Sequence, residues 1–311
     1  MSIEFAFIGG TNRGYKLIEA LIEKEFIPKF AIILKEDEHE ELKYSDKISG
    51  LLNKNQIVNS IKKKLTETEY NKIQESNLDF VIVSGWRTLI NTKVSRYIKF
   101  GLIAAHHSLL PKYRGFAPTQ WAIINGETET GVTLFLINEG EADSGKIISQ
   151  EKIPILFEDY AIDLDNKLIN CTIKLFLEFF VNYQKKKIVL TKQNELEATY
   201  TCKRTPQDGR INWSKNSLEV YNFIRALAHP FTGAFCEYNN NLLYIRRARL
   251  GDNNNKNFAG NIPGRVIKIN PDGIEVLCGN GTILITEWEN KIIGVVNCPS
   301  ENIKSINSTL K

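Results

Sequence analysis

The chain has no apolar run long enough to cross a membrane and no cysteines paired by a C-x-x-C spacing. A membrane helix needs about 20 consecutive apolar residues. The five scattered cysteines argue against a disulfide framework, and we expect no bound metal. The opening residues, MSIEFAFIGG, also lack the basic start and cleavage site of a signal peptide. These absences predict a cytoplasmic protein with no membrane partner.

A strong charge of either sign is also missing. The sequence has 40 basic and 36 acidic residues, for a formal net charge of +4. This surplus is small and dispersed, so it does not form an electrostatic footprint for nucleic acid. The length of 311 residues favours two domains, or one domain with a large appendage.

The first hundred residues alternate between strand-like and helix-like patterns. Apolar β-rich runs occur at 3–9, 30–35 and 78–85, and helical spacing begins at Gly14 and recurs near 57–75. This alternation predicts an α/β fold, a Rossmann-like, doubly wound and mostly parallel sheet. In such a sheet, ligands bind at the carboxyl ends of the strands.

The first strand is followed by the glycine turn GGTNRG at 9–14. It lacks the full G-x-G-x-x-G spacing, and no acidic residue closes the second strand, so a dinucleotide site is not favoured. Arg13 lies near the start of the following helix, where backbone N–H groups and the helix dipole favour an anion. We expect Arg13 to meet a substrate phosphate.

The central stretch HHSLLPKYRG (106–115) places two histidines directly after a strand-like run. Later strands are predicted at 131–140 and 147–155, with Asp143 in the turn between them. His106 and Asp143 therefore both fall where strands meet loops. Successive side chains of an extended segment point to opposite faces, so His106 and His107 cannot both address one site.

These motifs resemble those of the formyltransferases that use 10-formyltetrahydrofolate. The family signature is Asn-x-His-x-Ser-Leu-Leu-Pro, then Arg-Gly, then a later Asp-x-Gly. Here it matches His106, the run 108–111, Arg114-Gly115 and the run 143–145. The resemblance implies an enzyme that transfers a formyl group to an amine, with 10-formyltetrahydrofolate as cosubstrate and with His106 and Asp143 as catalytic residues in acid/base and orienting roles.

The C-terminal third also resembles part of this family. RTPQDGRINW (204–213) is followed by short β-rich runs within 262–289, separated by PDG and GNG turns. The pattern is similar to the C-terminal domain of methionyl-tRNA and aminoarabinose formyltransferases. We therefore expect a catalytic domain at 1–203 and an OB-like β-barrel domain at 204–311. The intervening segment 156–200 predicts a helix that faces the core.

One position departs from the family pattern, because Ala104 stands where the signature has Asn. An alanine methyl cannot donate to the oxyanion that develops during acyl transfer, and loss of one such donor costs about 10²–10³ in rate. His107, Thr119 or a backbone N–H could replace it. Alternatively, the site is altered, or the protein is a catalytically impaired binder of folate or sugar nucleotide. Hydrolysis of formyltetrahydrofolate is a further rival reaction.

The resemblance also implies the binding residues. The loop after the strand at 78–85 is expected to hold the folate, with Trp86 either stacking on the ring or capping the core. The predicted folate contacts are Gly85, Trp86, Thr88, Leu89, Ile90 and Asp143. The predicted acceptor contacts are Arg13, Ser108, Arg114, Gly115 and Arg204.

The acceptor is inferred from the segment ILKEDEHEELKYSDKI (33–48), which is rich in carboxylates. The methionyl-tRNA enzymes carry a basic loop at this place, and clustered negative charge repels a polyanion. The sequence therefore favours the amino group of a nucleotide-linked aminodeoxysugar, with methionyl-tRNA as the alternative. The expected partners are folate and a sugar nucleotide rather than nucleic acid, and homodimer formation is left open.

Overall fold

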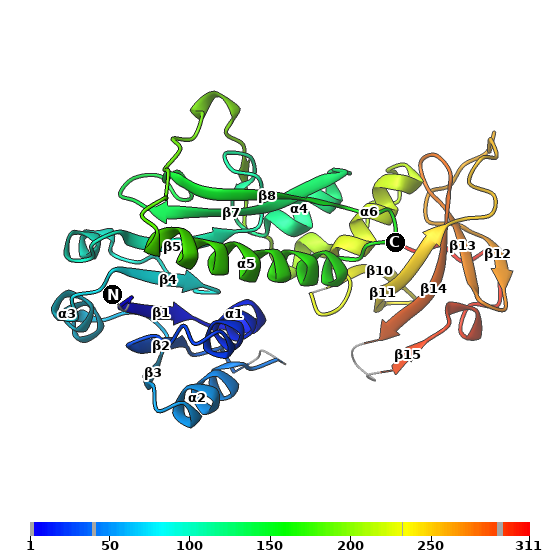
Figure 1. Cartoon of the computed structure of the whole chain (residues 1–311). Coiled ribbons are helices and arrows are strands. Elements are labelled where there is room, and N and C mark those ends of the chain that lie inside the picture. The colour runs from blue at the N-terminus through cyan, green and yellow to red at the C-terminus, as the bar shows by residue number, and fades with distance from the viewer. Residues whose placement is uncertain (1–2, 39–41, 232, 291–294) are drawn as a thin grey trace. The chain divides into compact units, whose positions relative to one another are not determined.

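The structure is a computed structural model that describes residues 3–38, 42–231, 233–290 and 295–311 (Figure 1). The chain divides into two compact units that interleave along the sequence. The N-terminal unit comprises Met1–Gly115, Gly131–Ile153 and Asn166–Tyr200. The C-terminal unit comprises Phe116–Thr130, Pro154–Asp165 and Thr201–Lys311. A domain boundary at 203/204 stays a prediction.

A seven-stranded sheet forms the centre of the N-terminal unit, in the order β3-β2-β1-β4-β5-β7-β8. The first five strands of this order pair in parallel, and β7 runs antiparallel to β5. This arrangement confirms the predicted doubly wound, mostly parallel fold. The strands are β1 (Phe5–Gly9), β2 (Phe30–Leu34), β3 (Val58–Lys62), β4 (Phe80–Ser84), β5 (Gly101–His106), β7 (Glu129–Ile137) and β8 (Ile147–Pro154).

Helices and apolar side chains cover both faces of this sheet. On one face, Phe179 and Phe180 of α5 (Ala161–Gln184) pack against the rings of Phe5 and Phe80. On the other face, alternate residues of β1, β2, β4 and β5 form a buried cluster with Ile73 of α3. The remaining helices of this unit are α1 (Thr11–Glu23), α2 (Ser45–Lys54), α3 (Glu67–Glu75) and the 3-10 turns η1 (Thr92–Tyr97) and η2 (Glu195–Glu197).

One predicted element is wrong. The stretch 57–75 was expected to be helical, but its first part forms β3, which pairs in parallel with β2, and only α3 is helical. Most of β3 is half-buried because the strand lies at the edge of the sheet. Edge strands tolerate polar and charged residues, and the sequence of β3 therefore lacks the apolar run that marks a central strand.

The turns after β1 and β4 meet where the strand order reverses. The Gly10 amide donates to the Ser84 carbonyl at 3.0 Å. Gly85 has a φ of +69°, and a Cβ at this position would lie 2.1 Å from the Gly10 carbonyl oxygen. Only glycine fits such an approach. The open-sheet rule places a ligand at this reversal point.

The C-terminal unit is built on a six-stranded antiparallel sheet, as expected for a smaller β-domain, while the OB-like barrel stays a prediction. Its path is β10-β11-β14-β13-β12, with β15 paired to β14. The predicted PDG and GNG turns connect β12 to β13 and β13 to β14. The elements are α4 (Pro118–Ile124), η3 (Pro206–Gly209), α6 (Ser217–Leu227), β10 (Ala234–Tyr238), β11 (Asn241–Leu250), β12 (Val266–Asn270), β13 (Gly273–Leu277), β14 (Thr282–Asn290), β15 (Val295–Asn297) and η4 (Pro299–Glu301).

A short two-stranded sheet pairs β6 (Arg114–Gly115) with β9 (Tyr200–Thr201). It joins the loop that follows β5 to a segment more than eighty residues later. Among the helices of the described ranges, none has both the length and the apolar character needed to cross a membrane.

Candidate active site

His106 ends β5, and the residue is buried, with 8% exposure. Nε2 lies 2.8 Å from the carbonyl oxygen of Tyr113, and Nδ1 lies 3.6 Å from Oδ2 of Asp143. A carbonyl oxygen can only accept a hydrogen bond, so this geometry assigns the Nε2 proton to the Tyr113 contact. Nδ1 is then the ring nitrogen that faces the carboxylate.

Asp143 lies in the loop between β7 and β8 with a φ of +59°. Its Oδ2 also accepts the Gly115 amide at 2.9 Å. Tyr113 is left-handed as well, with a φ of +60°. Two non-glycine residues in this conformation, each costing about 1–3 kcal/mol, persist only where surrounding contacts fix them. Gly145 completes the motif, because a Cβ there would lie 1.6 Å from the Leu136 carbonyl oxygen.

The two histidines address opposite faces of the sheet, as the alternation predicts. His106 follows Leu102 and Ala104 on the face of the buried cluster. His107 is 3% exposed, and its Nε2 lies 3.2 Å from Oγ1 of Thr172 in α5. His107 is therefore not placed to replace the missing amide at Ala104. Thr119 is fully buried in α4 and belongs to the C-terminal unit.

The predicted folate loop follows β4 directly. Trp86 and Ile90 pack against the same buried cluster as Ala104, whose backbone pairs with Val83. Thr88 and Leu89 are exposed, Leu89 by 94%. The indole Nε1 of Trp86 is buried and has no hydrogen-bond partner among the described residues. A buried donor of this kind is usually paired, and the described residues do not supply its acceptor.

The predicted acceptor contacts occupy different environments. Arg13 lies in the first turn of α1. The Ser108 hydroxyl donates to the Lys112 carbonyl at 2.6 Å and so closes the turn after β5. Arg204 belongs to the C-terminal unit, where its guanidinium lies over the rings of Trp121 and Phe223.

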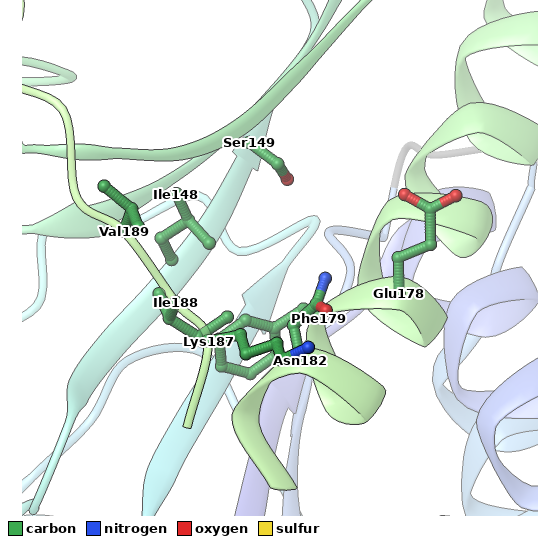
Figure 2. A pocket seen from close by; sticks show the side chains of 8 residues that line it. All are labelled: Ile148, Ser149, Glu178, Phe179, Asn182, Lys187, Ile188 and Val189. Carbon is green, nitrogen blue, oxygen red and sulfur yellow. The ribbon is translucent and has the colours of Figure 1, made fainter. Parts of the chain in front are cut away.

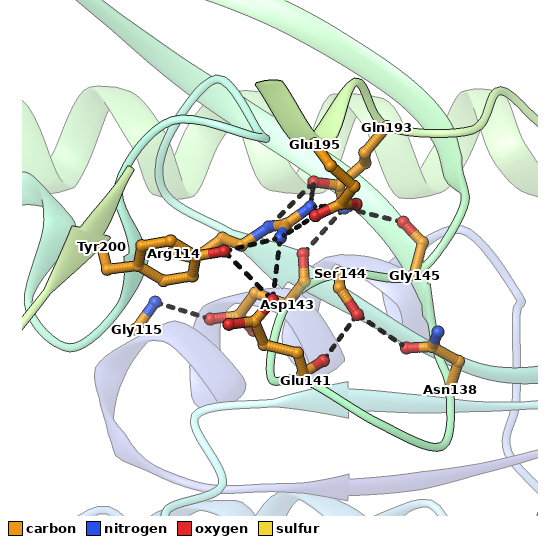
Figure 3. A network of polar contacts seen from close by, with 10 residues as sticks. All are labelled: Arg114, Gly115, Asn138, Glu141, Asp143, Ser144, Gly145, Gln193, Glu195 and Tyr200. Atoms are coloured by element: carbon orange, nitrogen blue, oxygen red, sulfur yellow. Dashed lines mark hydrogen bonds and ion pairs between the residues drawn. The ribbon is translucent and has the colours of Figure 1, made fainter. Parts of the chain in front are cut away.

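Arg114 is 1% exposed, and its guanidinium contacts Gln193, Glu195, Glu141 and Tyr200 (Figure 3). Its role as an acceptor contact stays a prediction. These four partners were not predicted from the sequence, because they lie up to 86 residues away in the chain and carry no motif of their own.

A cavity of about 200 Å³ lies between the end of α5, strand β8 and the segment 187–189 (Figure 2). None of the candidate catalytic or binding residues lines it. The side chains that line it are Ile148, Ser149, Glu178, Phe179, Asn182, Lys187, Ile188 and Val189. In the part of the chain that the structure describes, no group of three or more His, Cys, Asp and Glu side chains could hold a metal ion.

Fold and site together define an α/β enzyme with a histidine and a carboxylate at the end of a sheet strand. The formyl transferase family model matches residues 6–179, and the model of the formyl transferase C-terminal domain matches residues 203–295. The chain belongs to the formyl transferase family. This family uses 10-formyltetrahydrofolate as the formyl donor.

Individual relatives divide between two kinds of acceptor. The chain is 35% identical over 217 residues to a methionyl-tRNA formyltransferase of Clostridium acetobutylicum, covering 70% of this chain and 68% of the relative. A similar solved structure is WlaRD, a sugar 3N-formyl transferase, with a TM-score of 0.70 and 22% identity over 92% of this chain and 98% of WlaRD. Another is an N-formyltransferase from Helicobacter canadensis, solved with folinic acid and dTDP-3-aminofucose. Its TM-score is 0.70, and it is 21% identical over 91% of this chain and 99% of its own.

Proposed function

We propose that this enzyme transfers the formyl group of 10-formyltetrahydrofolate to the amino group of a nucleotide-linked aminodeoxysugar. His106 and Asp143 are the catalytic residues of this proposal. The observation that carries it is the contact of the His106 ring with both the Tyr113 carbonyl and the Asp143 carboxylate. A buried imidazole held between two such groups is suited to proton transfer.

In this mechanism, the acceptor amine attacks the formyl carbon and must lose a proton. Nε2 of His106 is committed to the Tyr113 carbonyl, so Nδ1 accepts the proton. Asp143, 3.6 Å from Nδ1, stabilises the imidazolium that results. The same proton is then available for the departing folate nitrogen. Asp143 holds its position through the hydrogen bond from the Gly115 amide.

The loop after β4 fits a folate on two structural grounds. Gly85 lets the turn pack against Gly10 at the point where the strand order reverses. The buried indole N–H of Trp86 is a donor for a polar atom of the bound ring. Ile90 and the exposed Leu89 supply apolar surface beside it. We assign the folate to this loop, with Thr88 and Asp143 as further contacts.

The segment after β2 supports a sugar nucleotide as the acceptor. The carboxylate of Glu36 is buried and accepts the backbone amides of Tyr44 and Ser45, so it stabilises the start of α2. Asp37 and Glu38 are exposed, and residues 39–41 of the predicted acidic loop lie outside the described residues. The exposed carboxylates leave this segment unsuited to the phosphates of tRNA. Two similar solved structures are sugar or sugar-nucleotide N-formyltransferases.

Methionyl-tRNA is the second candidate acceptor, and a specific observation favours it. The 35% identity to a methionyl-tRNA formyltransferase exceeds the 22% identity to WlaRD. Under this alternative, the enzyme would act without a basic loop after β2.

The test is a formyl-transfer assay with purified enzyme, 10-formyltetrahydrofolate, a panel of nucleotide-linked aminosugars and charged initiator tRNA. The proposal predicts a formylated sugar nucleotide and no formyl-methionyl-tRNA. Product with tRNA alone would overturn the assigned acceptor. Folate binding without product from any acceptor would identify the chain as an impaired binder in which Ala104 has cost the activity.

A further inference from the structure

The most buried charged side chain in the described part of the N-terminal unit is Arg114, which is 1% exposed and lies eight residues after His106. All three of its guanidinium nitrogens donate to groups of the protein. Nη1 and Nη2 bind the two carboxylate oxygens of Glu195 at 2.8 and 2.9 Å. Nε and Nη2 bind Oε1 of Gln193 at 3.2 and 2.8 Å. A fork of this kind fixes the guanidinium in one orientation.

The partners of Arg114 in turn hold the loop that carries Asp143 (Figure 3). Nε2 of Gln193 donates to the carbonyl oxygens of Asp143 and Gly145, each at 2.7 Å. Nη1 of Arg114 also lies 3.3 Å from Oε2 of Glu141, at the start of the same loop. The carbonyl groups of Asp143 and Gly145, and the Glu141 side chain before them, are therefore linked to one guanidinium.

The backbone of Arg114 connects to the other half of the site. Its neighbours in sequence are Tyr113, whose carbonyl contacts Nε2 of His106, and Gly115, whose amide donates to Asp143. The amide of Arg114 itself donates at 2.9 Å to the carbonyl of Thr199, the residue just before β9. One residue thus lies at the centre of the contacts that bring the imidazole and the carboxylate together.

We propose that Arg114 is a positioning residue that, through Gln193 and Glu195, holds the Asp143 loop and the Tyr113–Gly115 segment against His106. This inference rests on the proposed catalytic roles of His106 and Asp143. It is an alternative to the expectation that Arg114 contacts the acceptor, and it is favoured because the guanidinium is directed to groups of the protein. A buried charge is costly unless its partners compensate it, and here the compensating partners are those that fix the loop.

Three variants and one control test this proposal. Arg114→Lys keeps the charge but loses the fork, and Gln193→Leu cuts the link to the loop without changing a charge. Glu195→Gln changes an exposed partner of Arg114 and should fold normally. It therefore tests the proposal even if one of the buried variants does not fold. The matched control is Arg246→Lys, because Arg246 is also a largely buried arginine paired with a carboxylate, Glu289, but in the C-terminal unit.

We expect kcat to fall by about 10- to 100-fold in Arg114→Lys and Gln193→Leu, because a displacement of about 1 Å has an effect of this size. The KM values for folate and acceptor should stay within about threefold of wild type, and Glu195→Gln should lower kcat by only a few-fold. Arg246→Lys should keep the wild-type kcat. A raised acceptor KM at unchanged kcat would overturn the proposal and identify Arg114 as a substrate contact.

A second measurement does not depend on the acceptor. The chain has four histidines, so the imidazole nitrogen signals of the apoenzyme can be resolved by ¹H–¹⁵N NMR. The His106 signals should shift in Arg114→Lys and Gln193→Leu, while those of His229 stay in place. Unchanged His106 signals in folded variants would overturn the positioning role. Absence of transfer by the wild-type enzyme would contradict the proposed function instead, and the NMR comparison would still decide the role of Arg114.

Discussion

His106 and His107 are adjacent in sequence, but they lie in two different regions of the N-terminal unit. The His106 ring lies among loops, between the Tyr113 carbonyl and Asp143. The His107 ring lies against α5, where it contacts the Thr172 hydroxyl. That hydroxyl donates to the Leu168 carbonyl, so it accepts from Nε2 of His107.

Burial alone does not distinguish the two rings, since His106 is 8% and His107 is 3% exposed. The difference lies in what each ring faces. His107 faces a helix, whereas His106 faces a carboxylate held by a strained loop. A histidine is a catalytic candidate because of the groups that surround it. Here the pleat of β5 directs the two side chains to opposite faces, and each ring therefore meets different groups.

The largest effect should come from His106→Ala. This change removes the proposed acceptor of the amine proton, and general acid–base groups of this kind contribute about 10²–10⁴-fold. We expect kcat/KM to fall by this factor while folate binding, measured by fluorescence titration, is retained. Activity within a few-fold of wild type would remove the distinction between the two histidines.

Asp143→Asn should have the next largest effect. Asparagine tolerates the left-handed backbone and can still accept the Gly115 amide, so the loop should keep its structure. It carries no charge to stabilise the imidazolium, and we expect kcat to fall by roughly 10- to 100-fold. Steady-state kinetics together with an unchanged thermal unfolding temperature would support this reading. A loss of stability with normal kcat would show that Asp143 is structural.

His107→Leu should show the opposite pattern. The substitution removes a buried hydrogen bond, so the free energy of unfolding should fall by about 1–3 kcal/mol, while kcat stays within about threefold. Urea denaturation and the formyl-transfer assay measure the two quantities on the same preparation. If kcat fell as far as in His106→Ala, the opposite faces of β5 would not separate the two roles.

The smallest effect on activity should come from Glu69→Gln, because Glu69 lies in α3 and makes none of the contacts described for the site. Burial raises the pKa of this carboxyl, but hydrogen bonds from Thr66 and Lys62 outweigh it and lower the pKa to about 2. The folded pKa lies below the ordinary value of 4.5, so the stabilisation is fully present above that pH and is lost as the pH falls towards 2.

At neutral pH, Glu69→Gln should lower the free energy of unfolding by about 2 kcal/mol and leave kcat unchanged. Below about pH 4, the variant and the wild type should approach equal stability. Urea unfolding measured across this pH range tests the expectation, and a constant difference between the two proteins at every pH would contradict it.

Much of the fold and part of the site could be predicted from the sequence. Apolar runs such as 78–85 marked the central strands because a strand buried on both faces must be apolar throughout. Two features of the site followed from local signals, namely the position of His106 at a strand end and that of Asp143 in a turn. The edge strand β3 was missed because its half-buried residues include polar side chains that give no strand pattern.

The support around the site could not be predicted, because it depends on contacts between distant segments. Gln193 and Glu195 reach Arg114 from about eighty residues away. The left-handed conformation of Tyr113 has no signal in its residue type, and that of Asp143 has only a weak one, because aspartate adopts this conformation far less often than glycine. Neither the long-range contacts nor these backbone conformations could therefore be predicted from the local sequence.

The most direct test of the account is a competition between acceptors. Equal concentrations of a nucleotide-linked aminosugar and charged initiator tRNA are offered to the wild-type enzyme with 10-formyltetrahydrofolate, and both products are measured by mass spectrometry. The proposed function predicts that the wild-type enzyme forms mainly the formylated sugar nucleotide and that His106→Ala forms almost none. Predominant formyl-methionyl-tRNA, or sugar formylation that persists in His106→Ala, would contradict it.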